Sequence, residues 1–290
     1  MKEIVVISGK GGTGKTSLVA SFAALSGTAV LADCDVDAAD LPLVLTPTVR
    51  RREVFRCGHE AVIRPDDCIG CGACLARCRF EAVRKTEGGA GEATFTVDAT
   101  ACEGCGVCVW ACPVKAIAFP ERLSGEWFVS ETRYGPMVHA RLTPGGENSG
   151  KLVSTVREAA RRLAEERRAD LILVDGPPGI GCAVIASVSG ASQVVVVTEP
   201  TLSGAHDMER VLELARHFAI PSAVCVNKWD LNPEMTAQIE DRARQAGATL
   251  AGRVRYDPAV TRAQIQGKTA VEWPEARVAD DIRAVWALVS

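Results

Sequence analysis

Eight of the twelve cysteines lie between Cys68 and Cys112 and repeat one spacing. Each half of this segment follows the pattern C-x2-C-x2-C-x3-C, and Pro113 comes directly after the last cysteine. Clustered thiols predict metal ligands, here Cys68, Cys71, Cys74 and Cys78 followed by Cys102, Cys105, Cys108 and Cys112. Structural zinc is one candidate metal, although zinc sites usually take their four ligands in separated pairs.

A second segment whose residues could bind a ligand matches G-x-x-x-x-G-K-[ST]. It is Gly9-Lys10-Gly11-Gly12-Thr13-Gly14-Lys15-Thr16. Glycines let backbone N–H groups close around phosphate oxygens, and the start of a helix favours an anion. The pattern predicts that Lys15 reaches the β- and γ-phosphates and that the Thr16 hydroxyl binds Mg²⁺. The expected nucleotide contacts are Gly11, Gly12, Thr13, Gly14, Lys15, Thr16 and Ser17.

The elements that must position this loop alternate between strand and helix. Apolar, β-branched runs at residues 4–7, 28–32, 171–174, 194–197 and 223–226 suit strands buried on both faces of a parallel sheet. Helical stretches at residues 15–25, 149–168 and 207–217 lie between them. This alternation predicts an α/β fold, a doubly wound and mostly parallel sheet of the P-loop NTPase type.

The alternation breaks at the cysteine-rich segment. Its two halves begin near Asp66 and Asp98 and are separated by the turn residues Gly88, Gly89 and Gly91. Such an internal repeat indicates an inserted α+β domain, which can bury little core and should be held folded by its metal centres. The expected domains are residues 1–58 and 123–290 for the sheet and residues 59–122 for the insert.

Residues 123–151 give a weaker pattern. Strand-like runs at 126–131 and 137–142 precede a turn at Gly145 and Gly146. Asn148 or Ser149 is expected to cap the helix that follows, with Lys151 in solvent and not in contact with nucleotide.

Composition excludes several classes of protein. The chain has 290 residues, 47% hydrophobic content and a net charge of -3, which argues against disorder and against a general nucleic-acid binder. No apolar run approaches the ~20 residues of a membrane span, and the final helix has acidic residues where membrane attachment needs basic ones. The start of the chain does not resemble an export signal, so we expect a reducing cytoplasm and no disulfides. The final apolar residues should pack on the sheet: Ile282, Val285, Trp286 and Val289.

Lys10 gives the glycine loop the form K-G-G-x-G-K-T. This form resembles the deviant Walker A motif of the MinD/ParA/Mrp family, which includes the nitrogenase iron protein. The resemblance implies Mg²⁺-dependent ATP hydrolysis by a homodimer, in which Lys10 reaches the partner's nucleotide. It also implies that Lys10, Lys15 and Asp35 are the catalytic residues.

Three further segments resemble motifs of the same family. Residues 31–35 end the second expected strand with D-x-D, which implies Asp33 in the Mg²⁺ shell and Asp35 orienting the attacking water. Residues 171–179 resemble the Walker B motif and second switch, with Asp175 at the Mg²⁺ shell. Asn227 is expected to contact adenine, although its N-K-x-D context also occurs in guanine-specific GTPases.

The cysteine spacing is that of bacterial two-cluster ferredoxins, so the insert resembles a 2[4Fe–4S] ferredoxin domain. In that pattern the fourth cysteine of each motif binds the other cluster. Arg79 stands where proline is usual and is expected to perturb local hydrogen bonding without abolishing the cluster. The resulting pairing is crossed: Cys68, Cys71, Cys74 and Cys112 for one cluster, and Cys102, Cys105, Cys108 and Cys78 for the other.

The remaining cysteines lie outside the two motifs. Cys182 follows Asp175 at an offset similar to that of a cluster-ligating cysteine in the nitrogenase iron protein. It is a hypothetical metal ligand at the dimer interface, and a small buried hydrophobe is the alternative. Cys34 and Cys225 are predicted in the core, and Cys57-Gly58-His59 is predicted to be a hinge.

Together these features predict an ATPase whose dimer cycle is coupled to its iron–sulfur clusters. The expected output is electron transfer to a redox partner or assembly and delivery of a metal cluster. A positioning or partitioning ATPase with redox-sensing clusters is the alternative, and a passive ferredoxin with a vestigial nucleotide site is a third.

Overall fold

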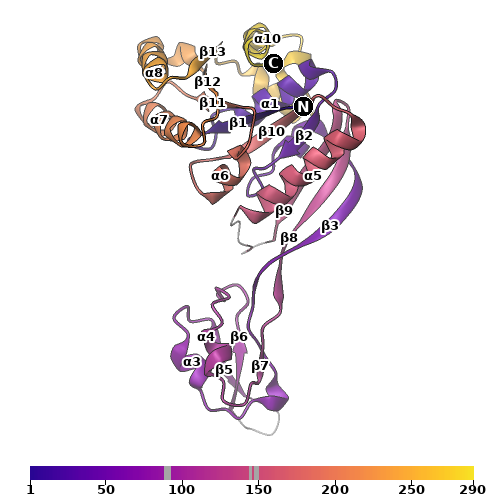
Figure 1. Ribbon diagram of the computed structural model, residues 1–290, viewed down its shortest axis with the longest axis vertical. Helices are drawn as coiled ribbons and strands as arrows, with labels where there is room; N and C mark the ends of the chain where they lie inside the picture. The colour runs from indigo at the N-terminus through magenta and orange to yellow at the C-terminus, as the bar shows by residue number, and fades with distance from the viewer. Residues whose placement is uncertain (88–92, 144–145, 147–149) are drawn as a thin grey trace. The chain divides into compact units, whose positions relative to one another are not determined.

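The computed structural model of the chain describes residues 1–87, 93–143, 146 and 150–290. These residues form two compact units, each described here by itself (Figure 1). The larger unit takes residues 1–53, 127–141 and 148–290, and the smaller unit takes residues 54–126 and 142–147. The smaller unit thus contains the segment 59–122 that the sequence marks as an insert.

Among the described residues, nine strands form one sheet in the order β13-β12-β11-β1-β10-β2-β9-β8-β3. Every pair from β13 to β9 is parallel, which confirms the predicted doubly wound and mostly parallel sheet. The strands are β1 (Lys2–Ser8), β2 (Val30–Asp33), β3 (Thr48–His59), β8 (Glu121–Thr132), β9 (Gly135–Leu142), β10 (Leu171–Pro178), β11 (Gln193–Thr198), β12 (Ser222–Asn227) and β13 (Thr249–Val254).

The central strands form where the sequence has uninterrupted aliphatic runs. Residues 4–7 of β1 and 194–197 of β11 are completely buried, as expected for strands covered on both faces. The register of β10 with β2 places Asp175 opposite Asp33. The two carboxylates therefore lie together at the carboxyl edge of the sheet, which is where ligands bind in open α/β folds.

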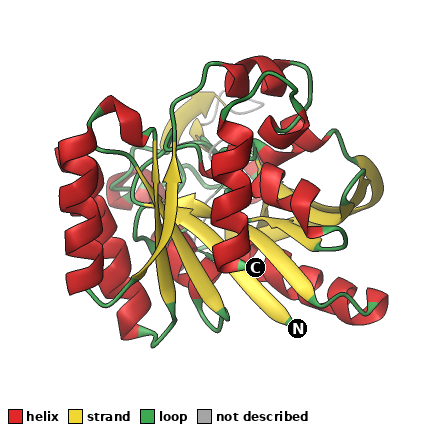
Figure 2. Cartoon of the chain, turned by 90° about the horizontal axis from the view of Figure 1, so that it is seen from above, coloured by secondary structure: helices red, strands yellow, loops and turns green. Residues whose placement is uncertain are grey.

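Helices lie on both sides of the strands in the larger unit (Figure 2). The predicted helix at 207–217 begins earlier, at Leu202, because the Thr201 hydroxyl accepts a hydrogen bond from the Gly204 N–H at 2.9 Å and caps it. The helices are α1 (Lys15–Ser26), α2 (Leu41–Leu45), α5 (Lys151–Arg167), α6 (Cys182–Val188), α7 (Leu202–His217), α8 (Pro233–Gln245), α9 (Ala259–Ile265) and α10 (Val278–Val289), with short 3₁₀ helices at Trp229–Leu231 and Ala270–Glu272.

The N-cap of α5 differs from the residues that the sequence predicts. Gly150 occupies the N-cap position, with φ of 83°. The expected caps Asn148 and Ser149, and the expected turn residue Gly145, lie outside the described residues. Lys151 is exposed at the first position of the helix.

The last helix packs on the sheet as predicted. Ile282, Val285 and Val289 are buried in the main core. Trp286 is partly buried against that core, with its ring centroid 5.2 Å from that of Phe22 in α1. Among the described residues, no helix has the length and apolar character needed to cross a membrane.

The smaller unit repeats a short pattern twice. Each half has a five-residue helix that begins directly after a glycine, Gly72 or Gly106, with φ of 72° or 73°. The unit also contains two antiparallel strand pairs and the ends of β3 and β8, while Gly88, Gly89 and Gly91 lie outside the described residues. Its elements are β4 (Val62–Ile63), a 3₁₀ helix (Pro65–Asp67), α3 (Ala73–Arg77), β5 (Val83–Glu87), β6 (Ala93–Val97), α4 (Val107–Ala111) and β7 (Ile117–Ala118).

Candidate functional site

The glycine-rich loop joins β1 to α1 at the carboxyl edge of the sheet. Gly12 and Gly14 take φ of 80° and 86°, in the left-handed region that favours glycine. A Cβ on Gly14 would lie 2.3 Å from Asn227 Nδ2, so the loop packs directly against the end of β12. Because α1 begins immediately behind these glycines, the loop is suited to hold an anion.

Lys15 is buried behind the loop and contacts two of the expected carboxylates. Its Nζ lies 2.7 Å from Asp175 Oδ1 and 3.4 Å from Asp35 Oδ2. Burial alone would lower the pKa of Lys15, but the charges of Asp175 and Asp35 outweigh this effect and raise it. Lys15 is therefore a charged group that carboxylates of its own chain neutralise.

Asp33 and Asp175 are fully buried, and each keeps one carboxylate oxygen, Oδ2, with no hydrogen-bond partner among the described residues. Burial raises the pKa of Asp33 well above its usual range, and the charge of Asp175 adds to the shift. Burial also raises the pKa of Asp35, against the lowering effect of Lys15. Orphaned carboxylate oxygens on two neighbouring strands fit a hydrated Mg²⁺, which one or two carboxylates commonly hold.

Two hollows adjoin the loop. One is lined by loop residues together with Lys15, Thr16 and Asp35 and by the Pro177-Pro178 segment after Asp175. The other lies between the start of α1 and the residues after β12 and β13. The two hollows are neighbours, because four residues line both: Gly12, Gly14, Ser17 and Gln264.

Asn227 lines the second hollow and also braces the loop. Its Nδ2 donates to the Thr13 carbonyl at 2.7 Å, and its Oδ1 accepts from the Lys228 N–H at 3.0 Å. The last residue of the N-K-x-D segment, Asp230, accepts from the Tyr256 N–H at 2.7 Å. Tyr256 lines this hollow, whereas Asp230 is not among the described residues that line it.

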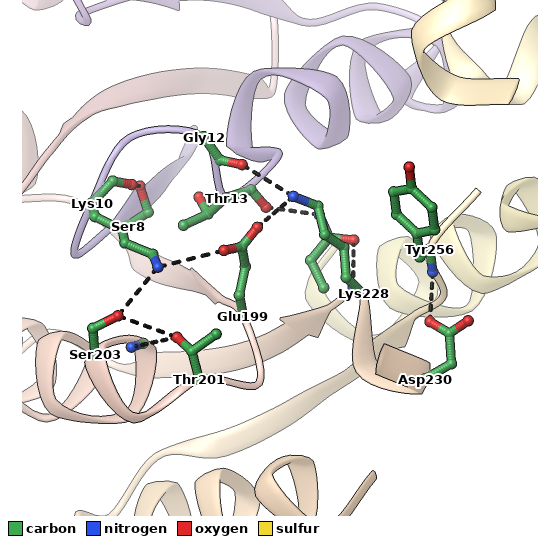
Figure 3. A network of polar contacts seen from close by, with 12 residues as sticks. Ser8, Lys10, Gly12, Thr13, Glu199, Thr201, Ser203, Lys228, Asp230 and Tyr256 are labelled. Atoms are coloured by element: carbon green, nitrogen blue, oxygen red, sulfur yellow. Dashed lines mark hydrogen bonds and ion pairs between the residues drawn. The ribbon is translucent and has the colours of Figure 1, made fainter. Parts of the chain in front are cut away.

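Lys10 points along the loop toward Glu199, which follows β11 (Figure 3). Its Nζ lies 3.6 Å from Glu199 Oε2 and 3.3 Å from Ser203 Oγ. The other oxygen of Glu199 pairs with Lys228, and Lys228 Nζ also donates to the Gly12 carbonyl at 3.3 Å. One carboxylate therefore lies between a lysine of the loop, Lys10, and a lysine that contacts the loop, Lys228.

Eight cysteines of the smaller unit line two hollows. The first has four sulfur-bearing residues and otherwise only apolar residues and glycine in its lining, among them Ile63, Phe95 and Ile117. Burial raises the pKa of its Cys74 thiol. Its four cysteines are Cys68, Cys71, Cys74 and Cys112.

The second hollow also has four cysteines in a largely apolar lining. Phe119 and Phe80 contribute apolar surface, while Arg77 and Glu103 add charge that the first hollow lacks in its described lining. Burial raises the pKa of its Cys108 thiol. Its four cysteines are Cys78, Cys102, Cys105 and Cys108, so each hollow takes three cysteines from one motif and one from the other.

The hollows suit an iron–sulfur cluster chemically, because soft thiolates and an apolar wall are what such clusters take as ligands and surroundings. The backbone beside the ligands is compact: a Cβ on Gly104 would lie 2.4 Å from the His59 carbonyl oxygen. Within the described part of the chain, no three or more His, Cys, Asp or Glu side chains lie close enough together to hold a single metal ion.

The other cysteines differ in their surroundings. Cys34, directly after β2, and Cys225, in β12, are fully buried in the core as predicted, and burial raises the pKa of Cys225 to about 12. Cys182 is exposed at the first position of α6, so the alternative of a small buried hydrophobe is wrong. Gly58 has φ of 69°, and the His59 ring stacks on Phe119 at 4.8 Å within the smaller unit.

Two residues of the site had no sequence signal. Gln264 of α9 lines both nucleotide hollows and donates from Nε2 to Ser17 Oγ at 2.8 Å. Glu199 pairs with Lys10 and Lys228, which are far from it in sequence. Each belongs to the site only through tertiary contacts, which a search for local motifs does not detect.

Comparisons with known proteins agree with this architecture. A 4Fe-4S dicluster domain family matches residues 61–119. The uncharacterised protein MJ0578 of Methanocaldococcus jannaschii is 34% identical over 235 residues, covering 79% of this chain and 79% of that protein. The septum site-determining protein MinD of Bacillus subtilis is 25% identical over 156 residues, covering 51% of this chain and 57% of that protein.

Solved structures share the fold. The cell division ATPase MinD of Pyrococcus furiosus matches with a TM-score of 0.58 and 17% identity, over 99% of this chain and 98% of that chain. MinD with Mg-ADP from Pyrococcus horikoshii matches with a TM-score of 0.60 and 16% identity, over 100% of this chain and 96% of that chain.

The parallel sheet, the glycine-rich loop and the acidic residues behind it define the larger unit as a P-loop ATPase fold. The chain belongs to the same family as the uncharacterised protein MJ0578, contains a 4Fe-4S dicluster domain and shares the fold of the MinD structures.

Proposed function

We propose that the chain hydrolyses Mg-ATP as a homodimer and couples this cycle to two [4Fe–4S] clusters, for electron transfer or for cluster assembly and delivery. The observation behind this proposal is that one chain combines a buried Lys15–Asp175–Asp35 group beside the hollow of the glycine-rich loop with two separate cysteine-lined hollows.

Each charged residue of the larger unit has a distinct role in this proposal. Lys15 exchanges its carboxylate partners for the β- and γ-phosphates, which neutralise it in their place. Thr16, Asp33 and Asp175 hold Mg²⁺, and Asp35 orients the attacking water. When bound, Mg²⁺ supplies positive charge that stabilises the transferring phosphoryl group.

The base proposed for the second hollow is adenine. Guanine-specific sites use the aspartate of N-K-x-D to read the base, whereas Asp230 here accepts from the Tyr256 backbone. Asn227 Nδ2 is engaged with Thr13, so Asn227 positions the loop as well as lining the base hollow. Gln264 is a further proposed contact, since it borders both the base side and the phosphate side.

The proposed cluster ligands follow the two hollows. Cys68, Cys71, Cys74 and Cys112 hold one cluster, and Cys78, Cys102, Cys105 and Cys108 hold the other. When bound, such clusters supply one-electron redox chemistry. Cys182 is a separate proposed interface ligand, exposed at the start of α6; unchanged metal loading and activity in Cys182→Ala would remove it from the proposal.

Coupling is tested on anaerobically purified full-length protein. ATPase rates of oxidised and reduced protein are compared, and cluster EPR spectra and reduction potentials are recorded with and without Mg-ATP. We expect nucleotide to change the potential and reduction to change the rate. If neither responds to the other, coupling is wrong, and a positioning ATPase of the MinD/ParA kind becomes the better proposal.

The crossed cluster assignment has its own test. Cys112→Ser should remove the same EPR signal as Cys71→Ser, although these residues belong to different motifs, and Cys78→Ser should match Cys105→Ser. Each variant should lose about half of the iron of a chain that binds two four-iron clusters. If Cys112→Ser instead removes the same signal as Cys105→Ser, each motif holds its own cluster and the crossed assignment is wrong.

A further inference from the structure

Among the described residues, Lys10 forms an ion pair with one acidic residue, Glu199. Its carboxylate is largely buried, with 16% of the side chain exposed, while Lys10 is 36% exposed. Ser203 Oγ, at the start of α7, gives Lys10 a second contact at 3.3 Å. The Lys10 ammonium group therefore has two contacts within its own chain, one to the loop after β11 and one to the first turn of α7 (Figure 3).

The same carboxylate also holds Lys228. One oxygen of Glu199 faces Lys10 and the other faces Lys228, whose Nζ in turn donates to the Gly12 carbonyl. The two lysines compete for one negative charge, because a single carboxylate cannot fully neutralise both. Removing one lysine should therefore strengthen the attraction between Glu199 and the other.

We propose that Glu199 is a positioning residue that retains Lys10 within its own chain, and that release of Lys10 from Glu199 and Ser203 is a required step of ATP-dependent dimerisation. This inference rests on the proposed function, in which Lys10 reaches the partner's nucleotide. A lysine held by Glu199 cannot at the same time contact phosphates of the other chain. Glu199 thus opposes premature dimerisation, and the nucleotide phosphates must outcompete it.

The test is sedimentation velocity of the full-length protein over a range of chain concentrations, with Mg²⁺ and saturating non-hydrolysable ATP analogue. Glu199→Gln keeps the shape and removes the charge, so dimers should form at roughly fivefold lower chain concentration, since two weak ion pairs are released per dimer. Ser203→Ala should shift dimerisation in the same direction by a smaller factor, without touching Lys228.

Lys228→Gln should change the chain concentration needed for dimerisation in the opposite direction. It leaves Glu199 to Lys10 alone, so dimerisation should require a higher chain concentration than in the wild type. Nucleotide affinity is measured separately on dilute protein, because Lys228 also contacts the loop. A purely structural role for Glu199 would make Glu199→Gln and Lys228→Gln change dimerisation in the same direction, and that result would overturn the inference.

Lys10→Ala separates this inference from the proposed function. If Lys10→Ala fails to dimerise while Glu199→Gln and Ser203→Ala behave like the wild type, Lys10 acts across the dimer but Glu199 does not restrain it. If Lys10→Ala dimerises normally, the trans role of Lys10 itself is wrong. The difference between wild type and Glu199→Gln should also shrink as salt rises, because a partly exposed ion pair is screened.

Discussion

The two units prepare their sites in different ways. In the larger unit, charged groups of the site are paired with one another: Lys15 with Asp175 and Asp35, and Lys10 with Glu199. In the smaller unit, the expected ligands are thiols around two hollows whose linings are mostly apolar. A paired site can exchange partners when a ligand arrives, whereas a thiol-lined hollow needs its ligand to complete the core.

This difference has an energetic basis. Burial of an unpaired charge is expensive, so a lysine behind a phosphate loop needs carboxylates when no phosphate neutralises it. Among the described residues of the smaller unit, the apolar cluster contains no group that could replace the metal, and two of its buried residues, Cys74 and Cys102, are themselves expected ligands. We therefore expect the larger unit to fold without its ligand and the smaller unit to depend on its clusters.

Iron removal should give the largest effect. Chelation under reducing conditions should unfold the smaller unit, because its few buried side chains cannot offset the lost metal bonds. In hydrogen–deuterium exchange, amides of residues 61–119 should lose protection while those of β1 and β10 keep it. Retained protection across residues 61–119 in iron-free protein would contradict the comparison.

Lys15→Ala should impair the larger unit and leave the clusters of the smaller unit intact. We expect the ATPase rate to fall about 100-fold or more, since a preorganised cation at the transferring phosphate is lost, while iron content and cluster EPR spectra stay as in the wild type. The matched control is Lys151→Ala, which removes an exposed lysine of the same unit. Loss of iron in Lys15→Ala would show that the nucleotide site supports the clusters.

The pH dependence of Mg-nucleotide binding should show a smaller effect. Burial raises the pKa of Asp33 and of Asp35, so both retain protons at pH values where ordinary aspartates are ionised. Mg²⁺ binds the ionised form, and its binding must release those protons. Affinity should therefore fall as pH falls through the raised pKa values, by up to about tenfold per pH unit for each proton released.

Calorimetry in two buffers of different ionisation enthalpy measures this proton release directly. Asp33→Asn should bind Mg-nucleotide more weakly and with a flatter pH profile. Over the same pH interval, EPR spectra of the smaller unit should stay constant. Mg-nucleotide binding without proton uptake or release would mean that these carboxylates are already ionised in the folded protein.

The sequence predicted the parts of both sites that depend on local spacing. The strand runs, the glycine loop and the C-terminal packing follow from short segments, and the structure confirms them. The sequence does not predict the first residue of α7, because the helical pattern begins at Asp207 whereas the Thr201 cap starts the helix at Leu202. Glu199 and Gln264 could not be found, since their contacts join segments distant in sequence.

Asn227 has one role that the sequence predicts and one that only the structure shows. Its replacement should have the smallest effect on nucleotide binding. The sequence predicts a base contact, and the structure adds a brace from Nδ2 to the Thr13 carbonyl at 2.7 Å. Asn227→Ala should weaken nucleotide binding roughly fivefold, the net worth of about one hydrogen bond. Asn232→Ala is the control, because Asn232 caps α8 through the Met235 N–H and its loss should reduce stability without reducing affinity. An equal loss of affinity in both variants would indicate that Asn227 acts only through general stability, and that the loop needs no brace from β12.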